Sequence, residues 1–119
     1  MKNFRMTIRQ FEIWMANLNP GIGTEPGKTR PVVIVQTDLL NQLHPSTVIC
    51  PVTTNVKPDS EILRVHLNKK PSGLLKEGDI MIDQIRAIDN RRLIRRVGVL
   101  TPTQARSVKE NLKCILDLI

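Results

Sequence analysis

Aromatic residues are scarce in this 119-residue chain, which has no tyrosine and carries Phe4, Phe11 and Trp14 as its aromatic side chains. Proteins that bind single-stranded nucleic acid without sequence preference stack successive bases on several aromatic rings. The scarcity therefore argues against a general base-stacking surface. Packing in a core or an interface is the expected role of Trp14.

Cysteine is equally rare, with Cys50 and Cys114 as the two thiols. Two cysteines so far apart in the sequence provide neither a disulfide framework nor the spacing of a metal site. Both fall in apolar runs, so we expect two buried, unreactive thiols. A chain that needs no disulfide suits a reducing cytoplasm.

Long apolar runs and the common catalytic signatures are also missing. No apolar run approaches 18 residues, and the basic N-terminus lacks the apolar core of a signal peptide, so we expect no membrane span. The chain contains no P-loop, GxGxxG, HExxH or CxxC motif. This excludes the nucleotide and metal sites that those motifs build.

What the chain has in excess is positive charge, with 18 Lys and Arg against 11 Asp and Glu and a formal net charge of +7. The charge is clustered at positions 69–70, 91–92 and 95–96. Clustered basic residues favour an anionic partner, either nucleic acid or an acidic protein segment. The length and the 40% apolar content are typical of one globular domain, residues 1–119.

The hydrophobic pattern predicts strands over residues 11–18, 31–36, 47–52, 62–67, 80–88 and 93–100. Residues 1–10 show no clear period and are interpreted as an N-terminal extension. Pro51 has no N–H, so its strand is expected to lie at a sheet edge or to carry a bulge there.

Residues 101–119 are predicted to form a C-terminal helix. The sequence Thr-Pro-Thr-Gln at 101–104 is a capping box with proline at the first helical position. Apolar side chains then recur at helical spacing, at Ala105, Val108, Leu112, Ile115 and Ile119. The whole pattern indicates an α+β, mainly β domain: a small twisted antiparallel sheet or open barrel with one C-terminal helix.

Residues 17–54 join a charged loop to two apolar strands. The loop is broken by Pro20, Gly21, Gly23, Pro26 and Gly27. It carries Glu25, Lys28 and Arg30, and the second strand ends on Thr53 and Thr54. A charged loop anchored on strands is a common place for a site, and the alternative is a long solvated connection.

Arg30 and the threonines suit phosphate chemistry. A guanidinium offers a planar fork of donors to phosphate oxygens, and a threonine hydroxyl can donate to another. Such a site could stabilise a phosphorane formed by the 2′-hydroxyl of RNA, with no metal or other cofactor. From the residues alone, the favoured alternative is that the arginine and the threonines have only a structural role. The proton-transfer groups stay open among Glu25, Asp83, His44 and His66, although solvated surface histidines are expected.

Three segments together are similar to one known family: residues 12–38 (EIWMANLNPGIGTEPGKTRPVVIVQTD), 47–55 (TVICPVTTN) and 78–93 (GDIMIDQIRAIDNRRL). In this order and spacing they resemble the MazF/PemK family of toxin endoribonucleases. The resemblance implies an SH3-like barrel that forms a homodimer in the prokaryotic cytoplasm. It also implies metal-independent cleavage of single-stranded RNA to 2′,3′-cyclic phosphate and 5′-hydroxyl ends. The implied partner is an antitoxin whose acidic C-terminal segment blocks the site.

The resemblance also assigns residues. The family's catalytic arginine and threonine fall on Arg30 and Thr53. The implied RNA-binding residues are Thr24 and Glu25 in the loop, with the nearby charged Lys28, and Asp83 and Gln84 before the Ile-Arg motif. Arg86 and Asp89 would hold the strand and the turn that follow.

The chain departs from the plasmid-borne branch of the family, which has a histidine in the loop and an arginine two residues before the acidic residue. Thr24 and Met81 stand there, so the chain resembles the Arg/Thr branch, and the histidines gain no support as catalysts. A second hypothesis remains: a non-catalytic toxin or binding module of the same fold, as in gyrase-poisoning toxins. The Arg30/Thr53 pair is the feature that discriminates the two.

Overall fold

The computed structural model describes residues 7–59 and 63–118. Its strands are β1 (Glu12–Asn17), β2 (Thr29–Ile34), β3 (Ser46–Thr53), β4 (Arg64–Leu67), β5 (Gly78–Met81), β6 (Arg86–Asp89) and β7 (Leu93–Val99). Its helices are α1 (Lys69–Ser72) and α2 (Pro102–Leu116), with the 3₁₀ turns η1 (Ile82–Gln84) and η2 (Asn90–Arg92).

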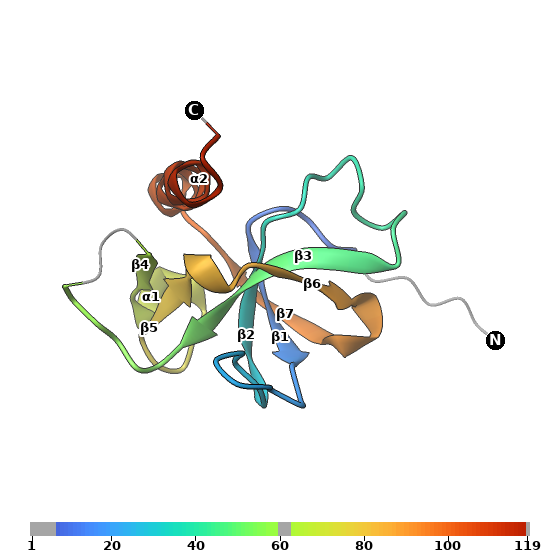
Figure 1. Ribbon diagram of the computed structural model, residues 1–119, viewed down its shortest axis with the longest axis horizontal. Coiled ribbons are helices and arrows are strands. Elements are labelled where there is room, and N and C mark those ends of the chain that lie inside the picture. The colour runs from blue at the N-terminus through green and yellow to red at the C-terminus, as the bar shows by residue number, and fades with distance from the viewer. Residues whose placement is uncertain (1–6, 60–62, 119) are drawn as a thin grey trace.

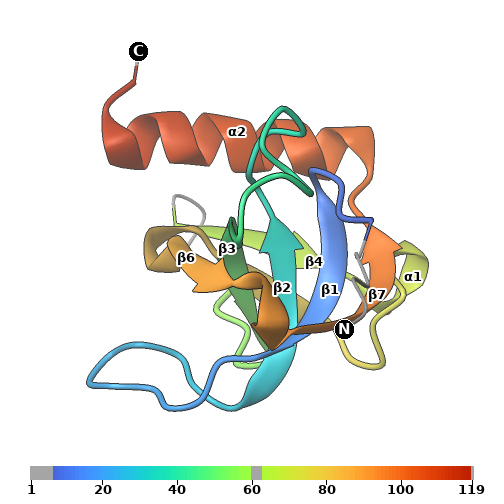
Figure 2. The ribbon, with the colours of Figure 1, turned by 90° about the vertical axis from the view of Figure 1, so that its right-hand side faces the viewer.

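The strands form one antiparallel sheet in the order β4-β5-β3-β2-β1-β7, and β6 pairs with β3 off this path. The helix α2 lies across one face of the strongly twisted sheet (Figures 1 and 2). The predicted mainly β fold with a C-terminal helix is therefore confirmed. Within the described residues no pairing joins β4 to β7, so the sheet stays open instead of closing into a barrel.

Two apolar clusters cover the two faces of the sheet. The first lies under α2 and includes Ile13, Val33 and Cys50. The second lies on the opposite face and includes Trp14, with 5% of its surface exposed, and Ile8, with 1% exposed. Trp14 is thus a core residue, as expected. Ile8, from the predicted N-terminal extension 1–10, packs in this cluster as well.

The C-terminal helix begins as the sequence predicts. Thr101 Oγ1 accepts a hydrogen bond from Gln104 N at 3.2 Å, and Gln104 Oε1 accepts one from Thr101 N at 2.9 Å. These two bonds satisfy N–H groups that a helix start leaves without partners. The predicted apolar face packs on the first cluster through the buried Val108 and the half-buried Ala105, Leu112 and Ile115. Ile119 lies outside the described residues.

Pro51 does not lie at a sheet edge, and no bulge interrupts its pairing with β2, where it faces Val32 in a regular register. On its other side β3 pairs with β6 over residues 46–49 and with β5 over residues 52–53. Val48 O accepts a hydrogen bond from Val35 N, so the backbone N–H and C=O of Val48 point toward β2. Because this direction alternates along a strand, the missing N–H of Pro51 points toward the junction between β6 and β5, where no ladder bond is lost.

The predicted strand 80–88 is broken in two. β5 ends at Met81 and β6 begins at Arg86, with η1 between them. The break lets the chain leave one part of β3 and pair with another, and the polar Asp83 and Gln84 mark it in the sequence. The predicted strand 62–67 is β4, and residue 62 lies outside the described residues.

The two cysteines differ. Cys50 is buried, and burial together with the nearby Asp83 raises the pKa of its thiol to about 12. This thiol is therefore inert as a nucleophile near neutral pH. Cys114 is exposed on α2, so its predicted burial is wrong. Its sequence neighbours are apolar, but its own position faces away from the sheet.

Candidate active site

The pairing of β2 with β3 brings Arg30 to the end of β3 that carries Thr53. The register ends at Val32 and Pro51, and the same register continued by two residues would set Arg30 opposite Thr53. Directly opposed residues in an antiparallel pair project from the same face of the sheet. Both residues are half-buried. Two residues that are 23 positions apart in the sequence therefore share one end of this strand pair.

The Arg30 guanidinium is oriented by backbone carbonyls. Its Nε donates to Gly27 O at 2.9 Å and its Nη1 to Val52 O at 3.4 Å. In the described part of the chain, Nη2 makes no hydrogen bond. Partial burial lowers the pKa of Arg30 below its usual value, but an arginine stays charged at neutral pH. The result is a fixed cation with donor capacity left for an anion.

Thr53 complements this cation with a hydroxyl. Its Oγ1 accepts a hydrogen bond from Asn55 N at 3.1 Å. This bond uses the oxygen as an acceptor and leaves the O–H free to donate. The turn after β3 thus holds the Thr53 side chain while its proton stays available to an acceptor such as a phosphate oxygen.

The loop between β1 and β2 projects from the sheet on the side away from α2 (Figures 1 and 2). Its base is closed by Leu18 N donating to Lys28 O at 3.0 Å and by Lys28 N donating to Asn19 Oδ1 at 2.6 Å. Its two arms touch at Gly21 and Gly27, where a Cβ on Gly21 would lie 2.7 Å from a backbone oxygen.

This loop displays the predicted RNA-binding residues Thr24, Glu25 and Lys28, all of which are exposed. It stays compact because glycine permits the close approach of its arms. Arg30 is tied to the same loop through Gly27 O. The structure therefore joins these three residues to Arg30 in one segment.

Asp83 and Gln84 lie on η1, which contacts both β3 and α2. Asp83 is exposed and Gln84 is half-buried. Within residues 7–59 and 63–118, no hydrogen bond or ion pair joins either side chain to Arg30 or Thr53. They flank the segment of β3 that leads to Thr53 and do not belong to the Arg30–Thr53 pair itself.

Arg86 and Asp89 lie on β6, and Asp89 holds the turn as the resemblance implied. Asp89 Oδ1 accepts from Arg91 N at 2.8 Å, and the Arg91 side-chain hydrogen bond is the largest cause that lowers the pKa of Asp89 to about 2. Arg86 faces Ile49 of β3, and its Nη1 is buried without a hydrogen-bond partner in the residues described.

The sequence profile of the family described as PemK-like, MazF-like toxin of type II toxin-antitoxin system matches residues 9–116. The chain belongs to this family. Among curated relatives, Endoribonuclease EndoA of Bacillus subtilis (strain 168) is 29% identical over 114 residues, which cover 96% of this chain and 98% of that protein. The resemblance seen in the three sequence segments is thereby confirmed.

Solved structures of the family share the fold. MazF from Deinococcus radiodurans matches with a TM-score of 0.81 and 23% identity, over 95% of this chain and 99% of that one. An endoribonuclease in complex with its cognate antitoxin, from Mycobacterial species, matches with a TM-score of 0.76 and 20% identity, over 94% and 97%. At these identities the likeness establishes the fold.

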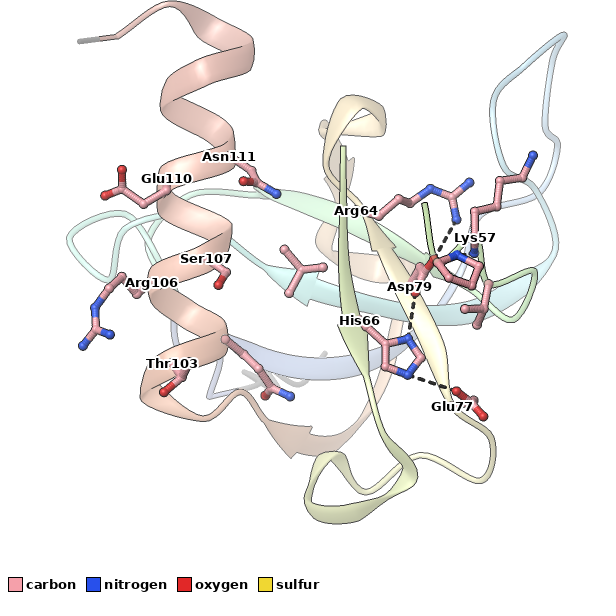
Figure 3. A pocket seen from close by; sticks show the side chains of 14 residues that line it. Lys57, Arg64, His66, Glu77, Asp79, Thr103, Arg106, Ser107, Glu110 and Asn111 are labelled. Atoms are coloured by element: carbon pink, nitrogen blue, oxygen red, sulfur yellow. Dashed lines mark hydrogen bonds and ion pairs between the residues drawn. The ribbon is translucent and has the colours of Figure 1, made fainter. Parts of the chain in front are cut away.

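Beside Thr53, whose register partner on β5 is Asp79, this family member has a cavity of about 740 Å³ between β4, β5, the turn at 56–58 and α2. Figure 3 shows His66 at its wall, between Asp79 and Glu77. His66 Nδ1 lies 2.9 Å from Asp79 Oδ1, and Nε2 lies 3.0 Å from Glu77 Oε1. A neutral imidazole has one N–H, so the ring donates to both carboxylates only when it is doubly protonated.

The carboxylate of Asp79 is buried and holds three partners. Besides His66, it accepts from Lys57 N at 2.9 Å and from Arg64 Nη1 at 3.3 Å. The hydrogen bond to Asp79 raises the pKa of His66. Burial opposes ionisation of Asp79, but its hydrogen bonds outweigh burial and keep its pKa below the usual value. His66 is exposed, as the sequence suggested, but its ring is held by two carboxylates that the sequence did not indicate.

No helix in the described residues is long and apolar enough to cross a bilayer. No group of three or more His, Cys, Asp or Glu side chains in that part of the chain is arranged to hold a metal ion.

Proposed function

We propose that this chain is the toxin endoribonuclease of a type II toxin–antitoxin system. It cuts single-stranded RNA, including mRNA, at short sequences without a metal ion, in the cytoplasm of a prokaryotic cell. The observation that carries the proposal is the hydrogen bond from Arg30 Nη1 to Val52 O at 3.4 Å, which holds the guanidinium at the end of β3 next to Thr53. Membership of the toxin family and the relative named as an endoribonuclease support it.

In the proposed reaction the RNA 2′-hydroxyl gives up its proton as its oxygen bonds to the adjacent phosphorus. The bond from phosphorus to the 5′-oxygen breaks and that oxygen takes up a proton, so no net proton is consumed. The products are a 2′,3′-cyclic phosphate and a 5′-hydroxyl. Arg30 and Thr53 donate hydrogen bonds to the phosphate oxygens, where negative charge accumulates in the transition state. The Arg30 cation also stabilises the negative charge that develops on the leaving 5′-oxygen.

Recognition is assigned to side chains around this pair. Thr24, Glu25 and Lys28 stand on the exposed loop, and Asp83 and Gln84 contact bases from η1. Because a charged backbone needs basic partners, the net charge of +7 assists binding of RNA. The same charge suits the acidic C-terminal segment of a cognate antitoxin, which we propose binds a homodimer of this chain and blocks the site. One solved relative is described as an endoribonuclease in complex with its cognate antitoxin, and another as MazE-MazF from Deinococcus radiodurans.

The test is cleavage of a long single-stranded RNA by purified protein in excess EDTA, with fragment ends mapped by sequencing. A matched substrate carries 2′-deoxy residues at the mapped positions. We expect discrete cuts in EDTA that the deoxy substitution abolishes. Absence of cuts by folded protein free of antitoxin would favour the non-catalytic binding module instead.

A further inference from the structure

Arg92 joins two distant parts of the chain. It ends η2, and its Nη1 donates to Asn17 O at 3.0 Å and to Asn19 O at 2.6 Å, residues that precede it by 75 and 73 positions. The Nη1 group of an arginine carries two N–H bonds, so these two carbonyls use both. The contact therefore attaches the end of β1 and the start of its loop to the segment before β7.

The carbonyls of Asn17 and Asn19 lie beyond the end of the β1–β7 pairing, where the backbone of β7 no longer supplies N–H donors to them. The pairing of β1 with β7 ends at Ala16 and Leu93. Arg92 immediately precedes Leu93, and its side chain reaches past the last ladder pair. Its guanidinium thus continues the hydrogen bonding of β1 where the neighbouring backbone turns away into η2.

From Asn19 the contacts lead directly to Arg30. The side chain of Asn19 accepts from Lys28 N at 2.6 Å. Lys28 follows Gly27, whose carbonyl oxygen accepts from Arg30 Nε at 2.9 Å. One held residue, Asn19, therefore sets the position of the peptide that orients the Arg30 guanidinium.

We propose that Arg92 is a positioning residue that holds the Arg30 guanidinium in its productive orientation by fixing Asn19 at the neck of the β1–β2 loop. The proposal rests on the proposed role of Arg30 in RNA cleavage. Catalysis is sensitive to such placement because a shift of about 1 Å in a reacting group can cost a factor of about 100 in rate. Arg92 itself does not touch the substrate.

The test compares Arg92→Met with Arg91→Met. Methionine removes the donors and keeps most of the apolar stem. Arg91 is the matched control because it is exposed and bonds to Asp89 within its own turn. We expect kcat for RNA cleavage to fall about 10- to 100-fold in Arg92→Met, with KM nearly unchanged and Arg91→Met close to wild type. Arg92→Lys, which can donate to one carbonyl or both in a looser geometry, should recover part of the loss.

A second readout does not depend on activity. The ¹H–¹⁵N NMR signal of Arg30 Nε reports its hydrogen bond to Gly27 O. It should shift or broaden in Arg92→Met and stay in place in Arg91→Met. An unchanged Arg30 signal, or a kcat equal to that of wild type, would overturn the proposal. If wild type cuts no RNA, the proposed function fails, and the NMR comparison still decides whether Arg92 orients Arg30. Should Arg92→Met not fold, Arg92→Lys carries both measurements.

Discussion

At the scale of single residues, the proposed chemistry of the candidate site rests on two side chains. Arg30 supplies a cation whose direction is fixed by Gly27 O and Val52 O. Thr53 supplies a hydroxyl whose oxygen is held by Asn55 N. Each side chain is thus oriented by backbone groups before any ligand binds, which is the condition for strong transition-state stabilisation.

Replacing Thr53 by valine tests the hydroxyl. Valine keeps the branched shape and removes the donor, so we expect the fold to persist and kcat to fall by about 10²–10³. Steady-state cleavage of a short RNA containing one mapped site measures the change. The neighbouring Thr54 is exposed, and Thr54→Val should cleave at the wild-type rate. Equal losses in both variants would contradict the assignment of Thr53.

Sequence reasoning reached Arg30 and Thr53 because a family motif marks them, and it missed residues whose partners are remote. Arg92 appeared only as part of a basic cluster, since its carbonyl partners lie 73 and 75 positions away. His66 is exposed as expected, but its bond to Asp79 was missed because a carboxylate on a neighbouring strand leaves no trace in local sequence. Hydrogen bonds between distant segments require the pairing of the strands to be known first.

At the scale of elements, α2 is where local sequence and structure agree best. Its start is set within four residues by the reciprocal bonds of Thr101 and Gln104. Both bonds form between neighbours in sequence, so the pattern predicts them without knowledge of the sheet.

Removal of the cap should therefore be measurable. Thr101→Ala leaves an N–H of the first turn without its acceptor, and we expect the free energy of unfolding to fall by about 0.5–2 kcal/mol. Denaturant unfolding followed by circular dichroism measures the loss. Thr103→Ala, exposed in the same turn, should change it by less than about 0.5 kcal/mol. A Thr101→Ala protein as stable as this control would refute the cap's contribution.

The strands show where local patterns fall short. The period of apolar residues located all of them, but residues 80–88 were predicted as one strand and form β5, η1 and β6. The division depends on β3 changing partners along its length, which also makes room for Pro51. Such a change is a property of the assembled sheet, so a pattern read along one strand could not predict it.

At the scale of the whole molecule, the His66–Asp79 cluster joins β4, β5 and the turn that follows Thr53. Asp79 is the register partner of Thr53 on β5 and accepts from Lys57 N in that turn. The charged groups around His66 are Asp79, Glu77 and Arg64, and the cavity also exposes Lys57, Arg106 and Glu110.

This cluster makes folding stability depend on pH. The pKa of His66 is raised in the folded state, so the protonated ring binds its proton more tightly when folded. Its stabilising contribution is complete below the unfolded pKa of about 6.5 and is lost as the pH rises through the folded value. His66→Gln should therefore flatten the pH dependence of the melting temperature above about pH 6.5.

His44 provides the matched control for this measurement. It is exposed, and its ring contacts the backbone of its own loop at Ser46. His44→Gln should keep the wild-type dependence of melting temperature on pH. The same slope in wild type and His66→Gln would show that His66 does not stabilise the fold through its charge.

In the proposed function Arg30 acts in metal-free cleavage through the RNA 2′-hydroxyl. The most direct measurement is mass spectrometry of the fragment ends that wild type and Arg30→Ala produce from one RNA in excess EDTA, with melting curves for both. We predict 2′,3′-cyclic phosphate and 5′-hydroxyl ends from wild type, and a rate at least about 10² lower for a folded Arg30→Ala protein. Fragments with 3′-hydroxyl and 5′-phosphate ends, or undiminished cleavage by Arg30→Ala, would contradict the account.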